Sequence, residues 1–183
     1  MKKAIALLLA LVMVFALCAC GGDKGTADNG EKVVKIGVFE PASGDSGAGG
    51  KKEMLGMQYA NQETPTVEIG GETYKVELVY SDNGSDSAKA VSAASKLVNE
   101  KVSLVLGSYG SGVSIAASDT FKQAGIPAIG VTCTNPNVTA GNSHYFRICF
   151  LDPFQGTVLA NYASSELKAK KAYCLGENGN EYD

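Results

Sequence analysis

The sequence predicts an α/β fold: a doubly wound parallel sheet covered by helices. The first observation is the Val- and Leu-rich run Val102–Leu106, which is typical of a strand buried on both faces. The second is that a Gly-rich turn, Gly107–Gly112, leads directly into apolar residues at helical spacing. The third is that strand and helix patterns alternate along the chain, which implies parallel strands with right-handed crossovers. A chain of 183 residues, 45% hydrophobic, is long enough for one such domain and the start of another.

The first part of the sheet is predicted from residue patterns before position 82. A strand is expected at Val33–Phe39, followed by a Gly-rich loop that runs to Gly50. A helix follows, with its apolar residues between Met54 and Ala60. Val67–Ile69 and Glu72–Tyr80 flank a Gly-Gly pair and alternate in polarity, so they predict a hairpin.

The remaining elements continue the alternation, each bounded by residues that cap helices or form turns. They are a helix from Ser85 or Asp86 to Val98, a helix from Val113 to Ala124, strands at Pro127–Val131 and Tyr145–Phe150, a helix with Asp152 as N-cap and Gln155 at the capping-box position, and a strand at Lys171–Leu175.

The first twenty residues have the form of a secretory signal. A positive start, Met1-Lys2-Lys3, precedes an apolar run that is too short to span a membrane comfortably. Leu17-Cys18-Ala19-Cys20 resembles the lipobox of bacterial lipoproteins, in which the last Cys carries the lipid. Lipidation of Cys20 would anchor the exported protein to the outer face of the cell membrane or the periplasmic side. The alternative is an ordinary signal with incidental cysteines.

The domain plan follows from these patterns. Residues 1–20 are the expected lipoprotein signal peptide, and residues 21–31, which have no apolar period, form a flexible tether. Residues 32–150 form an N-terminal ligand-binding lobe. Residues 151–183 begin a second, similar lobe, and we expect this lobe to be truncated because no helix follows the last predicted strand.

Composition and motifs argue against several classes of function. The net charge is −3 and the Lys residues are scattered, so no nucleic-acid surface is indicated. The Gly-rich loop fails the phosphate-loop pattern because Gly50 stands where Lys is needed, and it fails the dinucleotide pattern at Lys52. The only His, His144, has no G-x-S-x-G motif and no acidic or Cys cluster beside it. We therefore expect no enzyme, no metal and no cofactor. An enzyme of flavodoxin-like fold is kept as a less favoured alternative.

Three cysteines remain in the exported part besides Cys20. Cys149 and Cys174 have apolar or aromatic neighbours, and Cys133 is the third. An odd number leaves at least one thiol unpaired within the chain. The neighbours favour buried, unpaired cysteines.

The expected site lies where the strands end. The carboxyl ends of parallel strands meet at one sheet edge, so Pro41–Gly50, Gly107–Gly112 and Thr132–Pro136 should lie together. N–H groups at the helix start after Gly110 carry partial positive charge, and a carboxylate is their natural occupant. Ser111 can cap that helix or bind the ligand. Tyr109 can be a packed aromatic or a wall of the site, and Thr134-Asn135-Pro136 can be a simple turn.

Short motifs in a fixed order run along residues 33–183. They are Ile36-Gly37-Val38, Pro41-Ala42-Ser43-Gly44, Lys96-Leu97-Val98, Gly125-Ile126-Pro127, Thr134-Asn135-Pro136, Phe146-Arg147 and Gln155-Gly156. In this order the chain resembles the periplasmic binding proteins of type I fold, and among them the branched-chain amino acid (Leu/Ile/Val) binding proteins of ABC importers. In that family two lobes close on an amino acid.

The resemblance implies roles for particular residues. Ser111, beside Tyr109 and Gly110 at the helix start, corresponds to the Ser that binds the carboxylate. Thr132 would offer its carbonyl to the ammonium, and Thr134 its N–H and hydroxyl. Tyr182 corresponds to the second-lobe Tyr that closes over the ligand, although Asp183 stands where the family has Gly.

The resemblance also implies partners. Such a protein captures a small amino acid or related zwitterion and delivers it to an ABC transporter permease. The family often has an aromatic residue where this chain has Gly49, which leaves the preferred amino acid open. The alternative function is an extracellular sensing domain that reports its ligand to a signalling partner.

Overall fold

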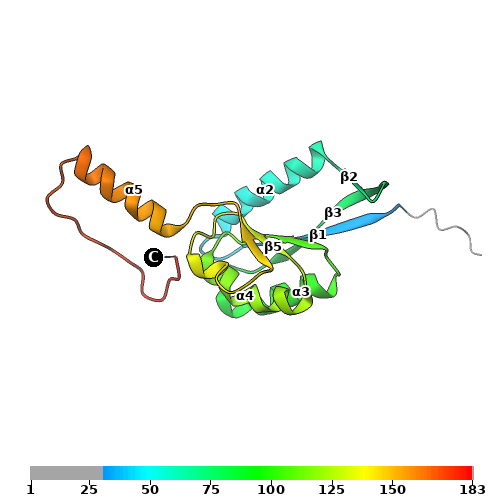
Figure 1. Cartoon of the computed structure of the whole chain (residues 1–183). Coiled ribbons are helices and arrows are strands. Elements are labelled where there is room, and N and C mark those ends of the chain that lie inside the picture. The colour runs from blue at the N-terminus through cyan, green and yellow to red at the C-terminus, as the bar shows by residue number, and fades with distance from the viewer. Residues whose placement is uncertain (1–30, 183) are drawn as a thin grey trace, which may run out of the picture. The chain divides into compact units, whose positions relative to one another are not determined.

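A computed structural model of the chain describes residues 31–182 (Figure 1). The predicted signal, Cys20 and the tether up to residue 30 lie outside the described residues. The strands are β1 (Val33–Glu40), β2 (Thr66–Ile69), β3 (Glu72–Asp82), β4 (Leu104–Leu106), β5 (Ala128–Gly130) and β6 (Tyr145–Arg147). The helices are α2 (Gly47–Glu63), α3 (Ser87–Asn99), α4 (Ser111–Ala124), α5 (Asp152–Ser165) and the 3-10 helix η1 (Pro136–Val138). Within the described part of the chain, no helix combines the length and apolar character needed to cross a membrane.

The strands form one six-stranded sheet in the order β2-β3-β1-β4-β5-β6. All neighbours are parallel except the β2–β3 hairpin at the edge. Helix α2 lies on one face of the sheet, and α3 and α4 lie on the other (Figure 1). The predicted doubly wound α/β fold is therefore confirmed. Its carboxyl edge carries the loops after β1, β3, β4 and β5.

The main core lies between the sheet and helices α3 and α4. Val105, Ala128 and Tyr145 are in register on β4, β5 and β6, and all three are buried. The rings of Phe39 and Phe121 meet edge to face with centroids 5.4 Å apart. Burial of a side chain of this size contributes about 1.5–3 kcal/mol. This core fixes the start of α4 relative to the strand ends.

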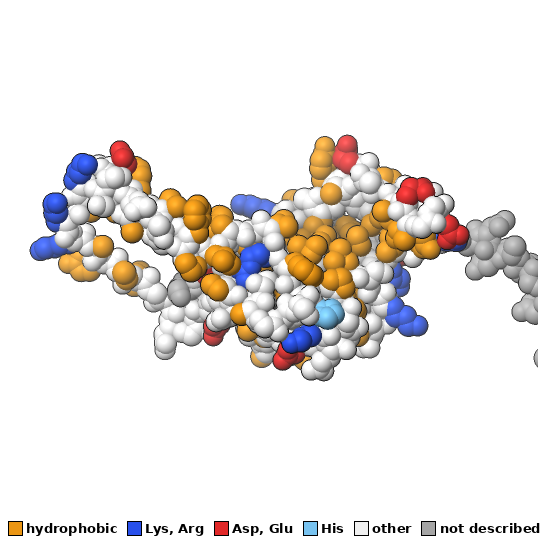
Figure 2. Space-filling view, in the orientation of Figure 1, with side chains coloured by type: hydrophobic (Ala, Val, Ile, Leu, Met, Phe, Trp, Pro, Cys, Tyr) orange, Lys and Arg blue, Asp and Glu red, His pale blue; other side chains and the backbone are white. Residues whose placement is uncertain are grey.

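The opposite face of the sheet is covered less completely. Tyr80, Val38, Leu106, Ile129 and Phe146 form one row in register across five strands on this face. Val38 is buried at the centre, whereas Tyr80 is 39% and Phe146 53% exposed at the ends of the row. Figure 2 shows hydrophobic side chains gathered near α2 on this side of the molecule. Helix α2 alone does not cover this face.

Several predicted boundaries are wrong. Helix α2 begins at Gly47 rather than after Gly50, and Gly50 packs closely inside it: a Cβ at Gly50 would lie 2.3 Å from the carbonyl oxygen of Pro41. Strand β6 ends at Arg147, short of the predicted Phe150, although the Ile148 N–H still donates to the Gly130 carbonyl of β5 at 3.1 Å. The N-cap of α5 is Leu151, one residue before the predicted Asp152, and Gln155 contacts the Asp152 side chain instead of completing a capping box.

The predicted strand at Lys171–Leu175 is also wrong. These residues are irregular, and the side chains of Tyr173 and Leu175 are 98% and 101% exposed. A strand is held by hydrogen bonds to a neighbouring strand, and the described residues offer none to this segment. A short apolar run alone did not determine its structure.

All three described cysteines are free. Only Cys133 is buried; Cys149 is half-buried and Cys174 is exposed, so the expectation of burial is wrong for Cys174. Burial raises the pKa of the Cys133 thiol to about 11, which keeps it protonated at neutral pH.

Candidate functional site

A cavity of about 570 Å3 lies at the carboxyl edge of the sheet. Its lining comes from the loops after β1, β3, β4 and β5, from the start of α4 and from the last described residues. All six residues that the sequence suggested for ligand binding line it: Tyr109, Gly110, Ser111, Thr132, Thr134 and Tyr182. The structure thus brings together residues as far apart in the chain as Tyr109 and Tyr182, which are separated by 73 positions.

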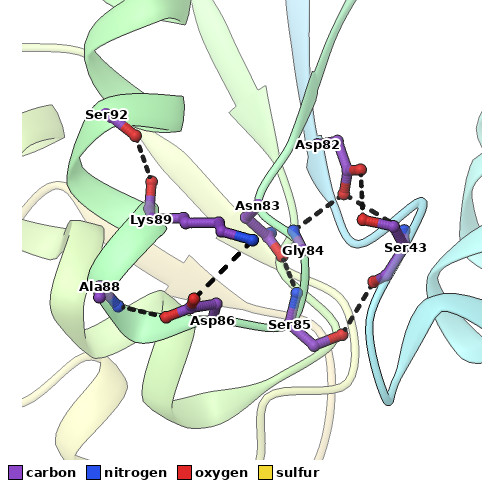
Figure 3. A network of polar contacts seen from close by, with 9 residues as sticks. All are labelled: Ser43, Asp82, Asn83, Gly84, Ser85, Asp86, Ala88, Lys89 and Ser92. Carbon is purple, nitrogen blue, oxygen red and sulfur yellow. Dashed lines mark hydrogen bonds and ion pairs between the residues drawn. The ribbon is translucent and has the colours of Figure 1, made fainter.

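Asp82 fixes two of the loops around this cavity (Figure 3). Its Oδ1 accepts N–H groups from Ala42 and Gly84, both at 2.8 Å, and its Oδ2 accepts the Ser43 hydroxyl at 2.7 Å. Burial acts to raise the pKa of Asp82, but these hydrogen bonds outweigh it and hold the pKa below 3.8. Asp82 therefore holds the loop after β1 against the loop after β3.

A second connection runs between the same loops (Figure 3). The Ser85 hydroxyl donates to the Ser43 carbonyl at 3.2 Å and accepts the Ser46 N–H at 2.9 Å. Buried Asn83 donates to the carbonyl of Phe39 and to Ser108 Oγ, which ties the end of β3 to β1 and to the loop after β4. Asp86, not Ser85, caps α3 by accepting the Ala88 N–H at 2.8 Å.

Ser111 is the first residue of α4, and it does not cap the helix. The N-cap is Gly110, and no side chain accepts the first N–H groups of α4. Ser111 is 2% exposed, and its Oγ instead accepts the N–H of Asn135 at 3.2 Å. Among the described residues no acceptor takes the Ser111 hydroxyl hydrogen, so this hydrogen is available to a molecule in the cavity.

Thr134 lies in the loop after β5, and its hydroxyl oxygen is buried without a hydrogen-bond partner in the described chain. Arg147 fixes this loop by donating to the carbonyls of Cys133 and Asn135, both at 2.9 Å, and to Thr139 Oγ1 at 2.8 Å. Asn135 caps η1 through the Asn137 N–H, so the predicted turn is present as well. Burying an unpaired hydroxyl costs about 1–3 kcal/mol, and a ligand would remove that cost.

Thr132 and Tyr109 form another part of the wall. The Thr132 hydroxyl donates to Glu53 Oε1 at 2.6 Å and lies 3.2 Å from the Tyr109 carbonyl oxygen. The Tyr109 ring occupies the space beside Gly49, because a Cβ at Gly49 would lie 2.5 Å from the ring. Tyr109 therefore stands where a side chain at position 49 would otherwise reach.

Two carboxyl groups behind this wall were missed by the sequence analysis. Glu40 ends β1, is 1% exposed, and accepts the Tyr109 N–H at 2.7 Å. Its carboxyl group lies within hydrogen-bond reach of Glu53 of α2. Gly107, with φ of 118°, makes room for this arrangement, since a Cβ there would lie 2.7 Å from Glu40 Oε1. An acidic residue ending a buried strand is the only signal in the sequence that could have indicated this pair.

The last described residues lie at the mouth of the cavity. Tyr182 lines the cavity and is 50% exposed. The Asn135 side chain donates to the carbonyl of Glu181. Glu181 also lies beside Gly112, where a Cβ would be 3.5 Å from its side chain.

Comparison with known proteins agrees with this geometry. Residues 33–182 match the periplasmic binding protein family. The chain belongs to this family. One relative of the chain is the Leu/Ile/Val-binding protein homolog 2 of Brucella abortus. The two are 33% identical over 165 residues, which cover 90% of this chain and 43% of the relative. The chain thus spans less than half the length of that relative.

Two solved structures resemble this chain in fold and sequence. A leucine binding protein, LivK, from Thermotoga maritima has a TM-score of 0.70 and 38% identity, covering 75% of this chain and 39% of that one. The branched-chain amino acid transporter substrate binding protein LivJ from Streptococcus pneumoniae, in complex with isoleucine, has a TM-score of 0.69 and 36% identity. That match covers 76% of this chain and 40% of LivJ. The predicted family is therefore confirmed.

Proposed function

We propose that this chain is the amino-acid-binding part of an exported solute-binding lipoprotein that delivers a branched-chain amino acid to an ABC transporter. Its relatives carry the names of Leu/Ile/Val-binding and amino acid binding proteins, and one related structure holds isoleucine. The signal-like N-terminus with Cys20 supports export and lipid anchoring. Binding and release, without chemical change, are sufficient for this role.

The observation that carries the proposal is the unpartnered hydroxyl of Thr134 beside the start of α4. Thr134 is 4% exposed, and its Oγ1 has no hydrogen-bond partner among the described residues. The uncapped N–H groups of α4 and the free hydroxyl hydrogen of Ser111 line the same cavity. These donors together suit a carboxylate group.

The charged residues that line the cavity are all acidic: Asp45, Glu177 and Glu181. No Lys or Arg is among the described residues that line it. A carboxylate would therefore be held by neutral hydroxyl and N–H donors, which form charge-assisted hydrogen bonds with an anion. An amino acid is neutral overall, so it can enter such a cavity without a formal cation on the protein side, provided that both of its charges find partners.

Tyr182 is proposed to cover the bound molecule, because it lines the mouth of the cavity. Enclosure excludes water and strengthens each polar contact with the ligand. Cys20 would keep the protein near the permease, where the captured amino acid is released. A Cys20→Ala variant tests this anchor: it should lose incorporation of labelled palmitate and move from the membrane fraction to the soluble one, whereas Cys18→Ala should not.

Calorimetry with the native protein and the twenty amino acids tests the main proposal. We expect leucine, isoleucine or valine to bind most tightly. Ser111→Ala should weaken that binding by about 1–3 kcal/mol, because the carboxylate loses one donor. Ser92→Ala, on the exposed side of α3 where Ser92 bonds only the Lys89 carbonyl, is the matched control and should bind normally. Unchanged affinity in Ser111→Ala would remove Ser111 from the site, and no binding of any amino acid would refute the function.

A further inference from the structure

The carboxyl groups of Glu40 and Glu53 lie behind the cavity wall, outside the residues that line it. One oxygen of each is already used: Glu40 Oε2 accepts the Tyr109 N–H at 2.7 Å, and Glu53 Oε1 accepts the Thr132 hydroxyl at 2.6 Å. The other two, Glu40 Oε1 and Glu53 Oε2, are buried and receive no N–H or O–H group from the described residues. The two carboxyl groups lie close enough to form a hydrogen bond with each other.

A hydrogen bond between two carboxyl groups requires a proton on one of them. Burial, the hydrogen bond to Glu53 and the charge of Glu53 together raise the pKa of Glu40 from 4.5 to about 10, against the opposing effect of the Tyr109 N–H. Like charges at such short range do not both ionise. At neutral pH Glu40 is therefore protonated, and the negative charge that acts on it is that of Glu53.

Among residues 31–182, no cationic side chain shifts the pKa of Glu40. The groups that act on its pKa are Glu53 and the Tyr109 N–H, and the remaining titratable neighbour is Tyr145, which carries no charge at neutral pH because burial raises its pKa. The negative charge of the pair is thus balanced only by hydrogen-bond donors. In a site of low dielectric constant, such a charge acts on the adjacent cavity wall.

The pair also determines what Thr132 can offer to a ligand. The 2.6 Å bond to a carboxylate takes the hydroxyl hydrogen of Thr132 in preference to the contact with the Tyr109 carbonyl at 3.2 Å. Thr132 Oγ1 is then left with lone pairs only, and the Tyr109 carbonyl oxygen beside it is also an acceptor. Both groups can receive hydrogens from a ligand, but neither can donate one.

We propose that Glu40 and Glu53 share a single proton and act as positioning residues that turn the Thr132–Tyr109 wall into a recognition surface for the cationic nitrogen of an amino acid. Ser111, Thr134 and the start of α4 supply the donors for the carboxylate. The cavity then has an acceptor side and a donor side, which fixes the orientation of the ligand. The proposal rests on the proposed amino-acid-binding function and goes beyond it by assigning a role to two residues that do not touch the ligand.

Two variants separate a charge effect from a structural one. In Glu40→Gln, the amide can donate to Glu53 and accept the Tyr109 N–H, so the hydrogen bonds and one negative charge remain. In the double variant Glu40→Gln/Glu53→Gln, the shape remains but the charge is gone. Glu63→Gln, at the exposed end of the same helix, is the control.

The affinity of the native protein and each variant is measured for the tightest-binding amino acid and for the same molecule without its amine, for example leucine and 4-methylpentanoate. Glu40→Gln should bind both within about threefold of the native protein, because one charge is retained. The double variant should bind the amino acid about tenfold or more weakly and should bind the amine-free acid as well as or better than before.

Equal losses for both molecules in the double variant, or an unchanged preference for the amine, would overturn the positioning role while leaving amino-acid binding intact. A loss in Glu40→Gln as large as that in the double variant would overturn the shared proton. If the native protein binds no amino acid, the proposed function and this proposal both fail.

Discussion

Replacing Glu40 with Gln should change how the stability of the folded protein depends on pH. In the unfolded chain the carboxyl group has its ordinary pKa of 4.5, whereas in the folded protein burial, the hydrogen bond to Glu53 and the charge of Glu53 together raise the pKa to about 10. Between these values, folding takes up one proton. A raised carboxyl pKa therefore gives stability that is present at low pH and is lost as pH rises.

The size of this effect follows from one proton. The free energy of unfolding should fall by up to about 1.4 kcal/mol for each pH unit between the two pKa values. From pH 6.5 to pH 8.5, this amounts to about 2.7 kcal/mol. Other shifted groups affect the free energy of unfolding outside this window. The pKa values of Cys133 and Cys149 are raised, so these thiols affect it only near pH 9 and above, and the pKa of Asp82 is lowered, so this carboxyl group affects it only near pH 4 and below.

Urea unfolding followed by tyrosine fluorescence measures this dependence at a series of pH values. We expect the difference in unfolding free energy between the native protein and Glu40→Gln to change by about 2.7 kcal/mol across the window, with Glu63→Gln following the native protein. Parallel curves for the native protein and Glu40→Gln would show that Glu40 is ionised in the folded state. The reasoning on the shared proton would then be wrong.

Two further predictions concern the cavity wall and its support. Gly49→Ala should displace the Tyr109 ring, which would lie 2.5 Å from the new Cβ, and so change the order of amino-acid affinities with little loss of stability. In a Tyr109→Ala background the same change should have no further effect on affinity, and equal effects in both backgrounds would contradict the contact. Asp82→Ala should lower the free energy of unfolding by about 1–2 kcal/mol at pH 7, because the hydrogen bonds between the loops after β1 and β3 are lost. Since the pKa of Asp82 is lowered below 3.8, this difference should shrink as pH falls below that value in urea unfolding, and a difference that stays constant down to pH 2 would refute the role of the carboxylate.

Residue patterns predicted most of the fold because each main element carries its own local signal. The hairpin around Gly70-Gly71 and the buried run of β4 are examples. Predictions failed where the neighbours decide the structure. Lys171–Leu175 has the apolar run of a strand but pairs with no described strand, and Gly50 lies inside helix α2, where close packing against Pro41 favours glycine.

The candidate site was predicted in part for a similar reason. Ser111 and Thr134 follow strand ends, and the topology of a parallel sheet brings such loops together. Whether Ser111 caps α4 or faces a ligand was undecided, because both uses need the same residue at the same place. The structure shows that Ser111 does not cap α4, since its Oγ accepts the Asn135 N–H from the loop after β5, and ligand binding by Ser111 stays a prediction.

By itself the sequence determined the α/β class, the order of the strands along the chain and the loops that surround the cavity, because these depend on hydrophobic period and on capping and turn residues close in the chain. Tertiary structure alone decided that Tyr109 fills the space beside Gly49 and that Glu40 meets Glu53. The protonation of a carboxyl group depends on its burial and on charges brought near it by folding. No local pattern records either quantity.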